Sequence, residues 1–515
     1  MSASHMVNVS GKLMAPENLA HQVAAWKSKG KTVALAHGVF DLVHLGHLRH
    51  LQEARNTGDV LVVSLTADAF VNKGPGRPVF PAEARAEMLA ALAIVDAVVI
   101  NHAATAVPMI TALKPDIYVK GIEYAEADKD VTGKITEEQE AVEAHGGRIH
   151  FTDDVVFSSS SLLNHHFDIY DPTLRNYLQS CRQTDMLPRL LQAIDNLAGM
   201  KVLLVGDTII DEYQYVTPLG KSPKENMIAT RFMEREVFAG GIIAAANHVA
   251  GVCAQVEVLT CLGQADSHEK LIRQTLAPNV KLSAVMRSGV PTTRKCRFVD
   301  TGYYRKLFET YYFDDNPLDE APQARFDHLT ASRAKQYDLV IVTDFGHGLI
   351  APSTIAALEK NARFLAVNAQ SNSANHGYNL ITRYGRADYI CIDGPEARLA
   401  MGDKHSPMET VIRDRLATRI DCPNIVVTHG KNGCITYNRD QGFTTIPAFT
   451  KTVVDTVGAG DAFLALTSPL VAAGCPLDLV GFIGNAAGAI KVGILGHRRS
   501  VEKSQLIKTV TALLK

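Results

Sequence analysis

The sequence predicts an α/β protein with two domains, each built on a mainly parallel sheet. Its 515 residues exceed what a single hydrophobic core usually serves. Short apolar runs of strand length alternate with helix-like segments along most of the chain, which is typical of parallel α/β sheets. A polar stretch between His165 and Met200 contains no strand-like run, so we place the boundary between the domains there.

The composition excludes several classes of protein. With 46% hydrophobic and 21% charged residues, the chain has the make-up of a globular protein and not of a disordered or fibrous one. A net charge of -2 gives no overall attraction to nucleic acid or to an anionic membrane, so anionic ligands must be held by local sites. The eight cysteines include no C-x-x-C pair, which disfavours a disulfide framework and a zinc site. No run approaches the roughly 20 apolar residues of a membrane span, and the first residues lack the apolar core of a signal peptide, so we expect a cytoplasmic protein.

Eight apolar runs are expected to form strands. Four precede the boundary, at residues 33–36, 60–65, 97–100 and 117–119, and four follow it, at residues 201–205, 339–342, 364–367 and 424–428. The resulting expectation is an N-terminal domain over residues 1–165, a helical linker over 166–199 and a C-terminal domain over 200–515.

A histidine pair follows the first predicted strand, where a helix is expected to begin. The turn and the first helical residues contain Gly38, Phe40, Asp41, His44, Gly46 and His47. Histidines three residues apart share one face of a first helical turn, whose free amides and positive dipole end attract phosphate. Imidazoles placed there can donate hydrogen bonds to the charge that builds on an α-phosphate as pyrophosphate leaves. The alternatives are a helix cap beside a packed histidine, or a metal site, for which no third ligand of suitable spacing is near.

The pattern Gly-x-Phe-Asp-x-x-His-x-Gly-His resembles the signature of the nucleotidyltransferase superfamily of cytidylyltransferases and adenylyltransferases. Segments at residues 73–78, 83–85, 114–121 and 158–161 are similar to the adenylyltransferase half of bacterial ADP-heptose synthesis proteins. The resemblance implies a Rossmann-like fold, catalysis by His44 and His47, and a nucleotide site formed by Gly38, Phe40, His44, His47, Lys120, Ser158, Ser159 and Ser160. It also implies substrate contacts from Asp41 and Arg85, and an exposed helix arginine is the alternative for Arg85. His37 stands where that family usually has asparagine.

A glycine turn followed by an aspartate stands near the C-terminus. A β-rich run leads through Gly458, Ala459 and Gly460 to Asp461 and an apolar helix. The amides of the three turn residues are expected to face a transferring γ-phosphoryl group, as an anion hole at a helix N-terminus. Asp461 can accept the proton of an attacking sugar hydroxyl, and a simple helix cap is the alternative for an aspartate at this position.

The pattern Asp-Thr-x-Gly-Ala-Gly-Asp resembles the signature of the ribokinase-like, or PfkB, carbohydrate kinases. The resemblance implies a kinase domain with a small β lid or dimer surface that includes Tyr303, Tyr304, Tyr311 and Tyr312. It implies ATP contacts from Thr428, Gly430, Gly433 and Asn485, and substrate contacts from Asp207, Asp211, Gly240, Gly241 and Lys295. It further implies Mg²⁺ held indirectly through Asp393 and Glu396, and a monovalent cation near the kinase site.

Three places depart from the pattern of that kinase family. Ala244 replaces a sugar-contacting asparagine, and Asn247 is the nearest amide. The run Asn368-Ala369-Gln370 replaces Asp-Pro-Lys, and Asp393 replaces the asparagine of Asn-x-x-Glu. Specificity built on hydrogen bonds to hydroxyls is sensitive to such changes, so the sequence leaves the identity of the sugar open.

Together the two halves resemble the bifunctional ADP-heptose synthesis proteins, with the order of the domains reversed. We therefore expect an enzyme that phosphorylates a sugar phosphate such as heptose 7-phosphate with ATP, and transfers a nucleotidyl group, AMP favoured, to a sugar 1-phosphate. The resemblance implies a homodimer formed through the kinase domain. Two alternatives stay open: a kinase and cytidylyltransferase for another sugar or polyol phosphate of a surface polysaccharide, and a nucleotide- or sugar-sensing protein with an inactive kinase half.

Overall fold

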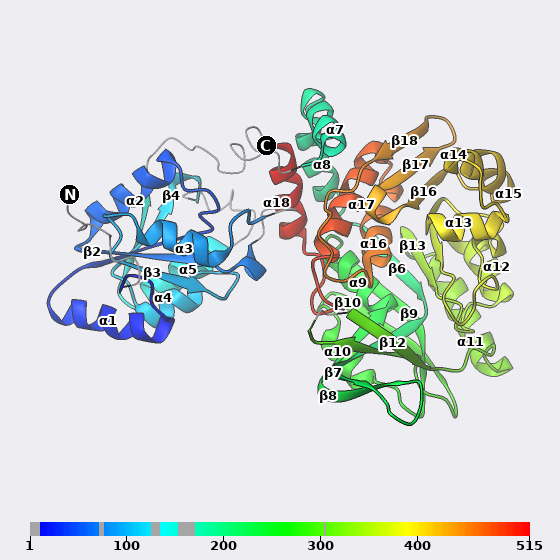
Figure 1. The fold of residues 1–515 in the computed structure, drawn as a ribbon. Helices are drawn as coiled ribbons and strands as arrows, with labels where there is room; N and C mark the ends of the chain where they lie inside the picture. Colours follow the sequence, from blue (N-terminus) through cyan, green and yellow to red (C-terminus); the bar gives the residue numbers. More distant parts are fainter. Residues whose placement is uncertain (1–10, 72–76, 125–133, 153–169, 303–304) are drawn as a thin grey trace. The chain divides into compact units, whose positions relative to one another are not determined.

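The described residues form two compact units, and the predicted α/β fold class is confirmed (Figure 1). The computed structural model describes residues 11–71, 77–124, 134–152, 170–302 and 305–515. One unit comprises the described chain up to Arg175 together with Ile507–Lys515, and the other comprises Asn176–Leu506. None of the helices in these ranges combines the length and apolar character that a membrane crossing requires.

The N-terminal unit contains a five-stranded parallel sheet with the strand order β3-β2-β1-β4-β5. Its strands are β1 (Val33–Gly38), β2 (Val60–Thr66), β3 (Ala97–Asn101), β4 (Ile117–Gly121) and β5 (Arg148–Thr152). The four strands predicted for this half are β1 to β4. From β1 the chain first adds β2 and β3 on one side, and it then adds β4 and β5 on the other side of β1. The carboxyl ends of β1 and β4 therefore form a topological switch point, where α/β sheets bind their ligands.

Both faces of this sheet are covered by helices, which is why its strands are continuous apolar runs. The face that bears Ala34 and Ala36 packs against α2 (Leu45–Thr57) and α3 (Ala82–Ala90). The face that bears Val33 and Leu35 packs against α1 (Pro16–Ser28), α4 (Val107–Leu113) and α5 (Lys134–Glu143). Two short 3₁₀ turns, η2 (Asp68–Phe70) and η3 (Ile122–Tyr124), follow β2 and β4.

The C-terminal unit is built on a nine-stranded sheet with the order β10-β9-β6-β13-β14-β15-β16-β17-β18. Neighbouring strands from β10 to β16 are parallel, and the last two pairs are antiparallel. The strands are β6 (Lys201–Gly206), β9 (Gln255–Gly263), β10 (Val280–Arg287), β13 (Leu339–Asp344), β14 (Leu365–Ala369), β15 (Tyr389–Asp393), β16 (Asn424–Thr428), β17 (Cys434–Asn438) and β18 (Gly442–Ile446). The four strands predicted after the boundary are β6, β13, β14 and β16.

Helices cover both faces of the large sheet. One face packs against α11 (Glu320–Ala334), α12 (Pro352–Asn361), α13 (Gly394–Met401) and the helical segment Met408–Arg419, which comprises α14 (Met408–Thr410), a π turn (Val411–Leu416) and α15 (Ala417–Arg419). The other face packs against α9 (Ile242–Ala250), α16 (Ala459–Ala472) and α17 (Leu477–Lys491). The remaining elements are α10 (Glu269–Thr275), η5 (Ile381–Arg383), η7 (Gly430–Asn432) and α18 (Lys503–Leu514).

A separate four-stranded sheet of order β12-β11-β7-β8 forms the predicted β lid. Its strands are β7 (Thr208–Lys221), β8 (Ile228–Gly241), β11 (Arg294–Asp300) and β12 (Arg305–Tyr312). Tyr311 and Tyr312 lie on β12, whereas Tyr303 and Tyr304 fall outside the described residues. β7 follows β6 after one residue, and β8 leads directly into α9. The lid is therefore connected to the large sheet at the carboxyl end of β6, where site residues were predicted.

The stretch predicted as a helical linker contains α7 (Pro172–Gln183) and α8 (Met186–Asp195). Tyr177 packs on the rings of Phe449 and Phe482, with ring centroids 6.3 Å apart in both cases. Arg189 lies 3.8 Å from Asp478 on α17. These helices therefore pack onto the C-terminal unit.

Candidate active sites

The predicted histidine pair meets at the start of α2. His44 is the N-cap residue, and its Nδ1 accepts a hydrogen bond from the Gly46 amide at 3.1 Å. The rings of His44 and His47 stack with centroids 4.0 Å apart, and the Phe40 ring meets the edge of His47 at 5.2 Å. Since Nδ1 of His44 is an acceptor, the proton of a neutral ring lies on Nε2. The predicted helix-cap role of His44 is therefore present in the structure.

A strained turn brings the pair into place. Phe40 has φ of 51°, a left-handed conformation that non-glycine residues seldom adopt, and it directly precedes Asp41. The fully buried Asp41 carboxylate accepts hydrogen bonds from Arg77 Nη1 at 3.0 Å and from the Val79 amide at 2.7 Å. Asp41 therefore holds the segment after residue 76 against the turn.

Arg85 is fully buried, so the alternative of an exposed helix arginine is wrong. Its guanidinium donates to the carbonyl oxygens of Phe80, Val39 and Thr66 at 2.5–2.9 Å, and to the Asp68 carboxylate at 2.5 Å. These acceptors come from the turn after β1, the end of β2, η2 and the segment before α3. Burial of this charge is tolerated because the donors are satisfied, and the result is a fixed position for the turn that carries the histidines.

Lys120 lies at the end of β4, across the switch point. Its Nζ is 3.0 Å from Glu138 Oε2, and Glu138 also accepts from the Tyr118 hydroxyl at 2.9 Å and the Ala106 amide at 3.0 Å. Burial alone would raise the pKa of Glu138, but Lys120 and the Ala106 amide hold it below its ordinary value. Burial and the Lys120 charge lower the pKa of His37 to about 3, so this ring is neutral at pH 7.

Glu138 was not predicted as a site residue from the sequence. Its neighbours Ile135 and Val142 on α5 are buried at helical spacing, so a carboxylate stands where the pattern favours an apolar side chain. That mismatch is the signal that could have identified it. Gly38 lies at the end of β1, and Ser158, Ser159 and Ser160 lie outside the described residues.

In the C-terminal unit, Asp461 is buried in the first turn of α16, directly after Gly458, Ala459 and Gly460. Gly458 has φ of 76°, and a β-carbon there would come within 2.6 Å of the His497 ring, so the turn requires glycine. Gln370 Nε2 donates to Asp461 Oδ1 at 3.1 Å. Burial raises the pKa of Asp461, and nearby His497 and Lys491 oppose the rise.

The first aspartate of the signature, Asp455, has a different position. Its carboxylate accepts from the Tyr213 hydroxyl at 2.6 Å, from Lys306 Nζ at 2.7 Å and from the Gly496 amide at 2.9 Å. Tyr213 belongs to β7 and Lys306 to β12, so Asp455 joins the lid to the loops around α16.

Asp211 lies on β7 between two basic side chains. Arg297 is paired with one of its carboxylate oxygens, and His497 Nε2 lies 3.2 Å from the other. Burial alone would raise the pKa of Asp211, but these partners hold it below its ordinary value. A β-carbon on Gly240 would collide with Asp211 Oδ2, which explains the first glycine of the predicted pair. Gly241 has φ of 55°.

Asp207 and Lys295 complete the predicted substrate residues. The Asp207 carboxylate accepts from the Phe345 amide at 2.9 Å, and burial together with Asp344 raises its pKa to about 7. Lys295 is buried, and its Nζ lies 5.1 Å from the centroid of the Tyr311 ring.

The residues predicted to contact ATP and Mg²⁺ lie at the ends of β15 to β18 and on α17. Asp393 and Glu396 form a capping box at the start of α13, with mutual amide to carboxylate bonds of 2.7 and 3.0 Å. Burial and the neighbouring Asp393 raise the pKa of Glu396 to about 8. The amide of Asn485 donates to the Ile446 and Pro447 carbonyls at 3.1 and 3.0 Å. Thr428 ends β16, and Gly430 and Gly433, at φ of 53° and 89°, bound the turn that follows.

Two positions flagged in the sequence have clear structural roles. Asn247 donates to the Thr275 carbonyl and accepts from the Ala277 amide, both at 2.9 Å, so it holds the end of α10. Gln370 contacts Asp461, a role that the departure from Asp-Pro-Lys did not reveal. His497, which pairs with Asp211, was not predicted from the sequence.

Two family models match parts of this chain. The model of the pfkB family carbohydrate kinases matches residues 200–504, more than half of the chain. The chain belongs to the pfkB carbohydrate kinase family. A second model, described as cytidylyltransferase-like, matches residues 35–165. In the pfkB half, Asp461 and its glycine turn correspond to the predicted kinase signature.

Curated relatives match a part of the chain. Bifunctional protein HldE of Syntrophotalea carbinolica is 37% identical over 172 residues, which are 33% of this chain and 34% of that protein. Bifunctional protein HldE of Citrifermentans bemidjiense is 45% identical over 133 residues, 25% of this chain and 26% of that protein. Each match therefore spans about a third or less of the relative's length. A solved variant of phosphofructokinase-2 from Escherichia coli, 13% identical, covers 61% of this chain and 100% of its own with a TM-score of 0.50, which supports the fold.

Proposed function

We propose that the protein is a bifunctional enzyme of nucleotide-activated sugar synthesis. The C-terminal unit transfers the γ-phosphoryl group of ATP to a hydroxyl of a sugar phosphate, of which heptose 7-phosphate is the favoured example. The N-terminal unit transfers a nucleotidyl group, AMP favoured, to a sugar 1-phosphate and releases pyrophosphate. The observation that carries the proposal is the buried carboxylate of Asp461 in the first turn of α16, directly behind the turn of Gly458 to Gly460. The HldE relatives are named bifunctional proteins, which supports two activities in one chain.

In the kinase reaction, Asp461 accepts the proton of the attacking hydroxyl. The hydrogen bond from Gln370 fixes one of its oxygens and leaves the other for the substrate. A base is most effective when its pKa approaches the working pH, and burial moves the pKa of Asp461 in that direction. The amides at the start of α16 stabilise the charge on the transferred phosphoryl group.

The kinase family resemblance implies Mg²⁺, and the residues around Glu396 fit an indirect site. The described residues contain no group of three metal-ligating side chains, so a cation there would arrive with the nucleotide phosphates. Burial raises the pKa of Glu396, and the negative charges of Asp393 and Asp461, which a cation would neutralise, raise it further. Mg²⁺ supplies charge neutralisation on the transferred phosphates, and Glu396 would hold it through bound water. A monovalent cation near the kinase site stays a prediction.

In the nucleotidyl transfer, His44 and His47 donate hydrogen bonds to the α-phosphate as pyrophosphate leaves. Lys120 adds positive charge on the opposite side of the switch point, and Arg85 and Asp41 keep the histidine turn in place. Attack by the sugar phosphate oxygen is direct, and no covalent enzyme intermediate is needed.

A homodimer through the kinase unit and a cytoplasmic location belong to the same proposal. The lid exposes large apolar side chains that a partner lid would cover, with exposed fractions of 53–67% at Leu219, Ile228, Phe232 and Phe308. Such a cluster is typical of a protein contact surface.

The test uses the full chain and two products. ADP release is measured with ATP and a panel of sugar phosphates that includes heptose 7-phosphate, and pyrophosphate release is measured with sugar 1-phosphates and either ATP or CTP. We expect ADP with heptose 7-phosphate and pyrophosphate with ATP. Pyrophosphate with CTP alone would instead support the cytidylyltransferase alternative, which the cytidylyltransferase-like match favours. Absence of ADP across the panel would support a sensing role for the kinase half.

A further inference from the structure

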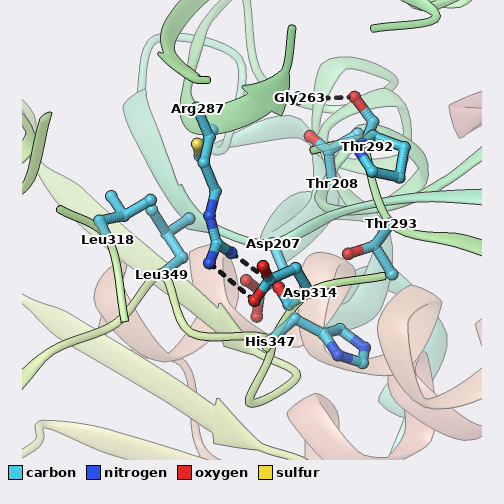
Figure 2. Close-up of a pocket in the computed structure, with 12 residues that line it drawn as sticks. Asp207, Thr208, Gly263, Arg287, Thr292, Thr293, Asp314, Leu318, His347 and Leu349 are labelled. Carbon is cyan, nitrogen blue, oxygen red and sulfur yellow. Dashed lines mark hydrogen bonds and ion pairs between the residues drawn. The ribbon is translucent and has the colours of Figure 1, made fainter. Parts of the chain in front are cut away.

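A small polar cavity of about 30 Å³ lies beside Asp207 in the C-terminal unit (Figure 2). It is lined by the ends of β6, β9 and β13 and by the segment before β11, including Asp207, Thr208, Gly263, Thr292, Thr293 and His347. One water molecule needs about 10–15 Å³ of such space. The cavity therefore takes one or two groups the size of a hydroxyl, and it is too small for a phosphate.

His347 is the unusual member of this lining. Its residue is only 5% exposed, and neither ring nitrogen has a hydrogen-bond partner within the described part of the chain. Figure 2 shows the ring on the side of Thr293, away from the paired Arg287 and Asp314. A buried polar group without a partner costs about 1–3 kcal/mol, so two such nitrogens beside a cavity indicate a ligand.

The protonation state of His347 limits the chemistry of that ligand. Burial and the nearby charge of Lys295 lower the pKa of His347 to about 3, so the ring is neutral at pH 7. A neutral imidazole offers one donor and one acceptor nitrogen. A hydroxyl group also donates and accepts, whereas a phosphate oxygen would use only the donor.

Asp207 lines the same cavity, and Lys295 lies on β11 two residues after the lining residue Thr293. The Lys295 Nζ has a ring contact with Tyr311 but no hydrogen bond or ion pair among the described residues.

We propose that His347, beside Asp207, forms a subsite for one hydroxyl of the acceptor sugar, distinct from the hydroxyl at Asp461. This proposal rests on the kinase function proposed above and names a determinant of its specificity. The phosphate of the acceptor lies outside the cavity. An acceptor that lacks the recognised hydroxyl leaves the His347 ring without a hydrogen-bond partner, which is how sites that bind hydroxyls reject deoxy analogues.

The test compares two variants of the full chain with wild type. His347→Leu keeps an apolar side chain of similar reach without hydrogen bonds, and His347→Gln keeps one donor and one acceptor. With heptose 7-phosphate we expect kcat/KM for the sugar to fall on the order of 10- to 100-fold in the leucine variant and less than tenfold in the glutamine variant. The KM for ATP should not change.

Monodeoxy analogues of heptose 7-phosphate identify the hydroxyl. In wild type, kcat/KM should be lower by on the order of tenfold or more for one analogue than for heptose 7-phosphate. In His347→Leu, kcat/KM for that analogue should be close to the value of the same variant with heptose 7-phosphate. The proposal is overturned if the leucine variant keeps wild-type kinetics, or if every analogue loses equally in both proteins. An ATP-induced rise in Tm shows that each variant is folded. If the leucine variant does not fold, the wild-type series decides, because the absence of any costly hydroxyl overturns the subsite.

Failure of the proposed function gives a different result. If wild type produces no ADP with any sugar phosphate, binding of heptose 7-phosphate is measured calorimetrically in wild type and His347→Leu. Weaker binding in the variant supports the subsite without the kinase activity. Equal binding, or none to either protein, overturns the subsite as well.

Discussion

The two units place opposite chemical groups on the same backbone feature. In the N-terminal unit the turn after a parallel strand leads into a helix, and in the C-terminal unit a loop does so. We propose that the first turn of each helix contacts phosphate. The N-terminal unit presents the imidazoles of His44 and His47 there and ties its carboxylate, Asp41, back into the protein. The C-terminal unit presents the carboxylate of Asp461, with the imidazole of His497 bound to Asp211 behind it.

This difference follows from the two reactions proposed. Nucleotidyl transfer needs donors for the charge on the α-phosphate, because the attacking sugar phosphate is already an anion. Phosphoryl transfer to an alcohol needs a base, because the attacking hydroxyl must lose a proton. A helix N-terminus serves both reactions, and the side chain in its first turn selects between them.

Removing one activity at a time is the strongest test of this comparison. Asp461→Asn should lower kinase kcat by about 10²- to 10⁴-fold, because the amide cannot accept the proton, and should leave pyrophosphate release unchanged. His47→Ala should have the reverse effect. Both products are measured for each variant. Loss of both activities in either variant would contradict two independent sites.

Arg85 tests whether the buried network behind the histidines is needed for folding. Arg85→Leu leaves the carbonyls of Val39, Phe80 and Thr66 without donors, and we expect the N-terminal unit to lose about 3 kcal/mol of stability. Calorimetric unfolding should show a lower Tm for that unit alone. Lys281→Leu, at a largely exposed side chain of the other unit, is a matched control. An unchanged transition in Arg85→Leu would show that this network contributes no stability.

Gln370 sharpens the description of the kinase base. Its hydrogen bond favours the ionised form of Asp461, so Gln370→Met should raise the pKa of Asp461. The acid limb of kinase kcat/KM should then move to higher pH by about one unit, because a bond to a charged group contributes about 1.5–3 kcal/mol in all. Gln370→Glu provides a comparison in which a second carboxylate should move the limb further. If kcat/KM of Gln370→Met falls equally at all pH values and the acid limb does not move, Gln370 has a purely structural role.

Glu138 gives the smallest effect and concerns pH-dependent stability of the N-terminal unit. Its pKa is lowered in the folded state, so its contribution is present above the unfolded pKa and is lost as pH falls through the folded pKa. Glu138→Gln should therefore reduce stability by about 1 kcal/mol at pH 7, and the difference from wild type should vanish in acid. Urea unfolding at a series of pH values measures this. A difference independent of pH would exclude an electrostatic origin.

The sequence predicted the features that lie close together along the chain. The His44 and His47 pair and the turn before Asp461 depend on spacing within a single strand, turn and helix, so local periodicity was sufficient. The side chains that support these groups come from distant segments: Gln370 is 91 residues from Asp461, and Arg85 is 46 residues from Val39 in the histidine turn. Their contacts depend on how strands order themselves in a sheet, which local pattern does not encode.

Arg85 shows the same limit of prediction from the local sequence. A charged residue near a helix start is usually exposed, and nothing adjacent in the sequence indicates the three carbonyl oxygens that surround its guanidinium. His347 was not predicted as a site residue. Its ring nitrogens lack hydrogen-bond partners in the described part of the chain, and this follows from the cavity that segments distant in sequence form around it.

The contacts of Asp455 have a consequence for protein engineering. Its carboxylate is held by Tyr213, Lys306 and the Gly496 amide, which lie in three separate parts of the chain. A chimera that receives only the seven-residue signature from another kinase would keep the motif and lose the residues that fix its first aspartate. Transplanting activity between such kinases therefore requires moving β7, β12 and the loop after α17 together with the motif.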